Sequence, residues 1–129
     1  MTTLTKSIDR LFGALLLIGA CLHVVGAVRA YPLGSEALVW SLSGTLAAGL
    51  LAVLNLVRAG RPDDHTLAAI TLVGSLAWVG IAIAFGVAIG NVVDPRVLWH
   101  AVAALVLAGF SLRSLLNRSL VRSIALPLA

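Results

Sequence analysis

The chain has 129 residues, of which 60% are apolar and only 11% are charged, and its formal net charge is +4. Soluble domains are about half apolar and about a quarter charged, and a domain this small cannot hide so much apolar surface in its own interior. The composition therefore argues against a soluble domain and predicts one membrane domain over residues 1–129. The Lys and Arg residues form no basic stripe interleaved with aromatic residues, which argues against nucleic acid as a partner.

Four stretches are long and apolar enough to cross a membrane, which takes about 20 mostly apolar residues. They cover residues 11–30, 37–57, 67–89 and 97–116. Backbone groups in lipid must be satisfied within their own segment, so each stretch should be a helix. We therefore predict an all-α, four-helix transmembrane bundle whose main partner is the lipid bilayer.

Three short links with turn-forming residues separate these stretches. The first, YPLGSE, contains Pro32 and Gly34, and Ser35 can cap the next helix. The third, GNVVDPR, has Asp94 as a possible cap and a proline at the first helical position. Because links this short make consecutive helices antiparallel neighbours, the bundle should run up, down, up and down.

Cationic residues are unevenly divided between the two ends of the predicted bundle. One end collects Lys6, Arg10, Arg58, Arg61, Arg113, Arg118 and Arg122. The other end has only Arg29 and Arg96. Cytoplasmic loops carry an excess of Lys and Arg. We therefore expect a protein of the plasma (inner) membrane with its N- and C-termini in the cytoplasm.

The residues after the fourth stretch also have a helical pattern. Apolar residues recur every four positions from Leu116, and arginines lie on another face. Amphipathic helices of this kind lie along the membrane surface. The pattern predicts a short helical extension at the cytoplasmic interface, ended by Pro127.

Two histidines fall inside the apolar stretches, on faces rich in small residues. His23 has Gly19 and Ala27 four positions away on either side, and His100 shares its face with Ala104. Small residues let membrane helices approach each other closely. Both imidazoles should therefore point at other helices and not at lipid.

The two histidines are also expected at similar depths below the extracytoplasmic surface. At 1.5 Å per residue, His23 lies about 10 Å from the end of the first stretch and His100 about 5 Å from the start of the fourth. Supporting polar and aromatic residues toward the same end are Glu36, Trp40, Thr45, Asp94 and Trp99. The sequence thus predicts a site for a small ligand or haem between the first and fourth helices.

Three accounts of this site stay open. His23 and His100 could supply both axial ligands of a haem b from different helices. They could instead bind a metal ion with Glu36 or Asp94 as a further ligand, although no HxxxH or HExxH pair supports this. In a purely structural account, the histidines bond to neighbouring helices and the aromatic residues form an interfacial belt.

Other functional classes are also possible for so small a hydrophobic chain. It could be an accessory or self-assembling subunit of a membrane complex, as a homo-oligomer or with other proteins. It could be a small transporter, although proton-coupled cation export normally uses a membrane-embedded carboxylate. No acidic residue is expected inside a helix, since the nearest, Glu36, lies at a helix end. No nucleophile motif or glycine-rich phosphate loop indicates an enzyme. Large residues on the remaining faces, such as Leu107, are expected to meet acyl chains.

Overall fold

Four helices follow one another in the part of the chain that the structure describes, residues 3–124, with side chains described as far as residue 116. In this computed structural model they are α1 (Thr3–Ala30), α2 (Glu36–Gly60), α3 (His65–Ala88) and α4 (Pro95–Ile124). No strand occurs in residues 3–124. The all-α prediction is confirmed, and each helix is long and apolar enough to span a membrane.

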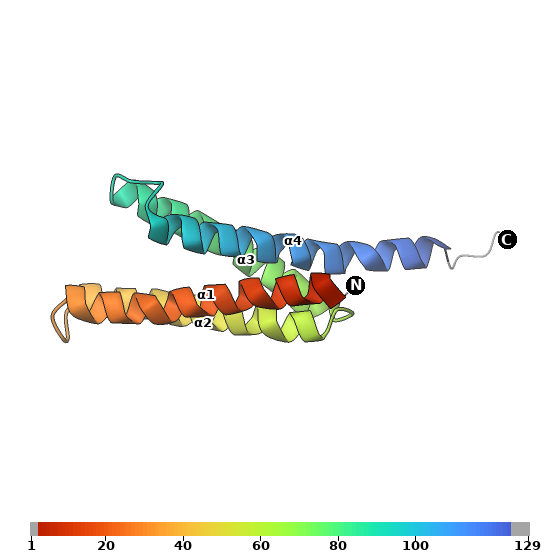
Figure 1. The fold of residues 1–129 in the computed structure, drawn as a ribbon, viewed down its shortest axis with the longest axis horizontal. Coiled ribbons are helices and arrows are strands. Elements are labelled where there is room, and N and C mark those ends of the chain that lie inside the picture. Colours follow the sequence, from red (N-terminus) through yellow and green to blue (C-terminus); the bar gives the residue numbers. More distant parts are fainter. Residues whose placement is uncertain (1–2, 125–129) are drawn as a thin grey trace.

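Consecutive helices are antiparallel and form two hairpins, α1–α2 and α3–α4 (Figure 1). The hairpins meet through α1 against α4 and α2 against α3. They lie close together near the start of α1 and diverge toward the other end of the bundle, where the α1–α2 and α3–α4 loops lie (Figure 1). The antiparallel order expected from the short links is confirmed.

The largest error in the predicted helix bounds is at the start of α1. This helix begins at Thr3 and not at residue 11, because the charged residues before 11 are helical as well. The predicted continuation of the fourth helix is confirmed as far as Ile124 (Figure 1). The predicted end at Pro127 lies outside the described residues, and the interfacial position of the extension remains a prediction.

Side-chain caps set the starts of α2 and α3. The Ser35 Oγ accepts a hydrogen bond from the Leu38 backbone N–H at 3.3 Å. The Asp64 Oδ1 accepts one from the Leu67 backbone N–H at 2.9 Å. These bonds satisfy N–H groups that have no partner inside the helix. The cap predicted at Ser35 is confirmed.

The cap of α4 is charged, and this gives a pH-dependent prediction. The Asp94 Oδ1 accepts hydrogen bonds from the Arg96 guanidinium at 2.8 Å and from its backbone N–H at 2.9 Å. These bonds lower the pKa of Asp94 to about 2. A carboxyl group with a lowered pKa in the folded state stabilises the fold above pH ~4, its unfolded pKa, and loses this contribution as pH falls through the folded pKa.

Asp94→Asn keeps a side-chain oxygen that can cap the helix but removes the charge. We expect the variant to have a slightly lower Tm than the wild type at pH 7, and the difference to disappear near pH 2. Thermal unfolding in detergent, followed by circular dichroism, measures both values. A Tm difference that stays constant between these two pH values would contradict the prediction.

The helices pack around a small apolar core. Its central members are Leu16, Leu51, Ala52, Ala103 and Leu107. Leu107 is completely buried, so the expectation that it meets acyl chains was wrong. Its position on α4 points toward the other hairpin, which the sequence of α4 alone does not reveal. Other large side chains, including Leu22 and Leu105, are exposed on the outside of the bundle.

Candidate functional site

The predicted site lies where α4 crosses α1. Gly19 has no side chain, and a Cβ atom placed there would lie 2.8 Å from Nε1 of Trp99 and 3.1 Å from Cε1 of His100. The Trp99 Nε1–H donates a hydrogen bond to the carbonyl oxygen of Leu15 at 2.9 Å. The glycine therefore allows two ring side chains of α4 to lie directly against the backbone of α1.

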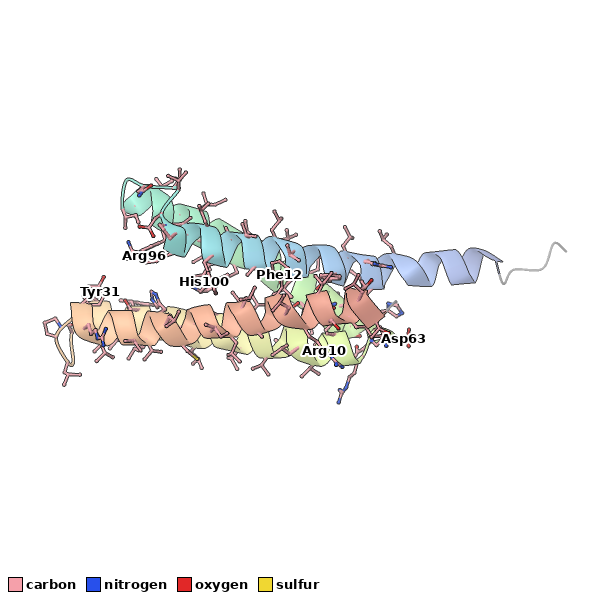
Figure 2. All side chains as sticks on the ribbon, in the orientation of Figure 1. Arg10, Phe12, Tyr31, Asp63, Arg96 and His100 are labelled. Atoms are coloured by element: carbon pink, nitrogen blue, oxygen red, sulfur yellow. The ribbon has the colours of Figure 1, made fainter. Side chains whose placement is uncertain are left out.

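His100 is half-buried and lies on the side of α4 that faces α1 (Figure 2), and Trp78 of α3 contacts its ring. The indole Nε1–H of Trp78 donates a hydrogen bond to Nδ1 of His100 at 3.3 Å. The two rings meet edge to face with their centroids 5.9 Å apart. Since Nδ1 accepts this bond, a neutral His100 carries its proton on Nε2. This Nε2–H makes no hydrogen bond to the part of the chain that the structure describes.

His23 lies one turn beyond Gly19 on the same face of α1. His100 lies against Gly19, so the two histidines are separated by about one helical turn along α1. His23 is exposed, however, and forms no hydrogen bond to any described residue. The expectation that both imidazoles are covered by other helices is therefore correct only for His100, because the hairpins diverge toward this end (Figure 1).

The supporting residues are divided among different roles. Trp99 lies beside the histidine of α4 and belongs to the site. Asp94 caps α4, as predicted, and is bonded to its own helix. Glu36 accepts a hydrogen bond from the Trp40 Nε1–H at 3.2 Å, and Thr45 donates to the carbonyl four residues earlier. These three residues of α2 thus use their polar groups within their own helix.

The residues present do not fit haem. Ligation by two histidines needs an unprotonated ring nitrogen on each imidazole, facing the iron from opposite sides. The bond from Trp78 occupies Nδ1 of His100 and leaves the proton on Nε2. The same ring lies so close to Gly19 that even a methyl group there would be crowded, so this crossing has no space for a porphyrin.

The residues offer little support for a metal ion either. Among the residues described, no group of three or more His, Cys, Asp or Glu side chains is arranged to hold one. The two acids proposed as further ligands, Glu36 and Asp94, have the hydrogen bonds described above. Neither acid is therefore free to join the histidines as a further ligand.

A second polar cluster, which was not predicted from the sequence, lies at the other end of the bundle. The Asp9 carboxylate and the Arg58 guanidinium form a fully buried ion pair with an O–N distance of 2.5 Å. The Arg58 Nε–H donates to Oδ1 of Asn55 at 3.3 Å, and the Asn55 amide donates to Oγ of Ser75 at 3.3 Å. This ion-pair cluster of four side chains joins α1, α2 and α3.

The expectation that no acidic residue lies inside a helix was therefore wrong. That expectation assumed that the charged residues before residue 11 lie outside the first helix. A signal for Asp9 was present, because Asp9, Gly13 and Leu16 recur at spacings of four and three and so share one helix face. All three are buried. Following the small and apolar face of α1 backward would have placed Asp9 on the buried side.

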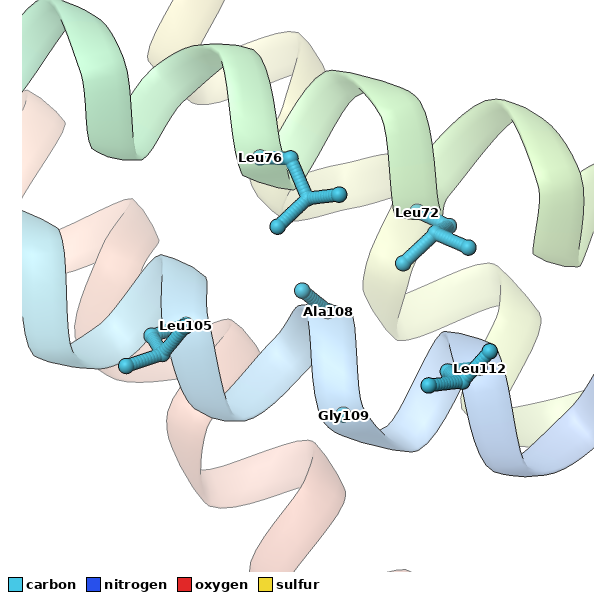
Figure 3. A pocket seen from close by; sticks show the side chains of 6 residues that line it. All are labelled: Leu72, Leu76, Leu105, Ala108, Gly109 and Leu112. Carbon is cyan, nitrogen blue, oxygen red and sulfur yellow. The ribbon is translucent and has the colours of Figure 1, made fainter.

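A shallow pocket of about 380 Å³ lies between α3 and α4 (Figure 3). It is lined by Leu72, Leu76, Leu105, Ala108, Gly109 and Leu112. None of these side chains carries a polar group that could recognise a ligand. The pocket is therefore part of the apolar outer surface, and the histidine pair remains the candidate site.

Comparisons with known proteins identify no relative. No protein-family model, curated protein or solved structure matches this chain. The functional interpretation accordingly depends on the chemistry of the residues and on their geometry.

Gly19→Ala tests the packing on which the site depends. The added Cβ atom would meet two atoms of the Trp99 indole at less than 3.0 Å. We expect α4 to shift, the bond from Trp99 to Leu15 to weaken, and the stability to fall by about 1–3 kcal/mol. Near-UV circular dichroism and unfolding in detergent measure these effects.

Gly26→Ala is the matched control on the same helix. A Cβ atom there has no neighbour within 4 Å, so the tryptophan signal should not change and the stability should not fall. Equal effects of the two substitutions would show that α4 does not cross α1 at Gly19.

Proposed function

We propose that the protein is an integral membrane protein of two helical hairpins that binds a small ligand between α1 and α4. The observation that carries this proposal is the position of His100 on α4 against Gly19 of α1, one helical turn from His23. Ionisable side chains inside a membrane are costly and are commonly functional. His23 is exposed and has no protein partner among the described residues, so its imidazole is available to bond to an external group.

Membrane insertion is supported by the outer surface of the bundle. Large apolar side chains such as Leu22, Val73 and Leu105 are more than half exposed, and contiguous apolar surface of this kind is unfavourable in water. The charge distribution supports cytoplasmic termini at the inner membrane, since Lys6, Arg10 and most other cationic residues lie at that end. Arg58 is paired with Asp9 and is left out of this count.

Single cysteines test the orientation. Cys21 is replaced by Ala, and a cysteine then replaces Leu33 in the first loop or Asp63 in the second. We expect a membrane-impermeant maleimide added to intact cells to label the protein only in the Leu33→Cys variant. Labelling of the Asp63→Cys variant alone would reverse the proposed orientation, and labelling of both would argue against membrane crossing by α2.

Native mass spectrometry after purification in mild detergent tests ligand binding. We expect the wild type to retain a small molecule that His23→Phe and His100→Phe lose. Trp40→Phe is the control, because Trp40 is exposed on α2 and bonds only within that helix. A wild type without any bound molecule, or equal retention by all variants, would refute the proposal. The appearance of a second copy or of another protein would favour an accessory or self-assembling subunit.

Small-molecule transport is the second candidate, and the buried Asp9 favours it. This carboxylate is a buried acid on α1, a helix long and apolar enough to span a membrane. Its charge is already paired with Arg58, however, so binding at the histidines is the better-supported function. Flux across liposome membranes that depends on Asp9, measured with Asp9→Asn, would reverse this order.

A further inference from the structure

We infer that the ligand is an uncharged, lipid-soluble molecule that presents a hydrogen-bond acceptor, such as a ketone or quinone carbonyl, to the Nε2–H of His100. The inference rests on the proposed function, because it names the chemical class bound at the same site. It is carried by the hydrogen bond that fixes His100, by the charges around the site and by the surface on which the site opens.

Trp78 determines which atom of His100 can act as a donor. An indole nitrogen only donates, so Nδ1 of His100 must be the acceptor of the 3.3 Å bond. A neutral imidazole then has its single N–H at Nε2. Leaving such a donor unpaired in an apolar environment is unfavourable, and a ligand with an acceptor atom removes that cost. A ligand that could only donate would not complement this ring.

The charged groups at this end of the bundle favour an uncharged ligand. Asp94 is paired with Arg96, and the same guanidinium lies 5.5 Å from the ring centroid of Phe85. Glu36 accepts a bond from Trp40 on α2. A cationic ligand would therefore find no free carboxylate beside the histidines. An anionic one would compete with Asp94 for Arg96, since Arg29 lies six residues beyond His23 on another face of α1.

The position of the site favours entry from the lipid phase. Beside the histidines, Leu22, Trp99 and Val102 are exposed on the outer surface of α1 and α4. The indole rings of Trp78 and Trp99 offer flat aromatic surfaces, which suit a conjugated carbonyl compound. His23, one turn further along α1, supplies a second polar group for the same ligand.

The protonation of His100 can be measured directly. The protein contains three histidines, so ¹⁵N NMR of a histidine-labelled sample resolves each ring. We expect a protonated Nε2 and an unprotonated Nδ1 for His100, and a mixture of both neutral forms in Trp78→Phe. A proton on Nδ1 in the wild type would overturn the inference while leaving the proposed function intact.

A pair of probes tests the acceptor itself. Decyl-1,4-benzoquinone and decylbenzene have the same alkyl chain, and only the first has carbonyl groups. In lipid nanodiscs, we expect the quinone to bind about tenfold more tightly, as one net hydrogen bond predicts, and to shift the Nε2 resonance of His100. His100→Phe should abolish the preference, Trp78→Phe should reduce it, and Trp40→Phe should retain it.

The outcomes separate this inference from the proposed function. Equal affinity of the wild type for the two probes would overturn the inference, even if native mass spectrometry still finds a ligand that the histidine variants lose. The inference would also be overturned if the molecule retained by the wild type has no hydrogen-bond acceptor atom. If neither probe binds and native mass spectrometry finds no retained molecule, both the binding function and the proposed ligand class are refuted.

Discussion

Arg58→Met is expected to destabilise the protein by about 3–5 kcal/mol, because it leaves the Asp9 carboxylate buried without its partner. Asp9→Leu should have a similar cost, since it leaves the Arg58 guanidinium buried. The double variant Asp9→Leu/Arg58→Met replaces both charged groups with apolar side chains and should recover most of the lost stability. Unfolding by SDS in mixed micelles, followed by circular dichroism, measures all three variants.

Arg61→Met is the control for this series. Arg61 is exposed three residues after Arg58, and substitutions at exposed positions usually change the stability by less than about 0.5 kcal/mol. A double variant no more stable than either single variant would show that the loss comes from packing and not from an uncompensated charge. Single variants as stable as Arg61→Met would show that the ion pair is not buried.

Leu107→Ala is expected to cost about 2–5 kcal/mol, the range for truncating a fully buried leucine. Leu107 is completely inaccessible and belongs to the central cluster that contains Leu16 and Leu51. The cavity left by the missing methyl groups lies between the two hairpins, where the surrounding helices can close it only in part. The same unfolding measurement detects the loss.

Leu105→Ala provides the matched control, because Leu105 is 57% exposed on the same helix. Two positions along a helix turn the side chain by about 200°, to the opposite side. The control should therefore lose less than about 1 kcal/mol. A larger loss for Leu105→Ala than for Leu107→Ala would mean that α4 is rotated relative to the structure described here.

The apolar core separates the two polar clusters. Asp9 and His23 lie fourteen residues apart on α1, which corresponds to about 21 Å along the helix. Leu16 is between them and is completely buried. A ligand at the histidines can therefore bind without disturbing the ion-pair cluster. Transport across the bundle would require the core to open, a larger change than binding requires.

Several features could be predicted from the sequence because they depend on local chemistry. The number and type of the helices follow from runs of apolar residues that only a helix can satisfy in lipid. Short links make neighbouring helices antiparallel, and the caps at Ser35 and Asp94 depend on bonds within three residues. Counting residues along helices of constant rise also predicted a similar level for His23 and His100, and the structure places His100 against Gly19, one turn from His23.

Only the tertiary structure decided how these helices face one another. Asp9 and Arg58 are 49 residues apart, and no local pattern identifies them as partners. The tautomer of His100 depends on Trp78 of another helix, and the exposure of His23 depends on the divergence of two hairpins (Figure 1). Hydrophobicity and periodicity indicate which face of a helix is apolar. The burial of a given side chain also depends on the angle and rotation at which helices pack, and these arise from contacts between distant segments.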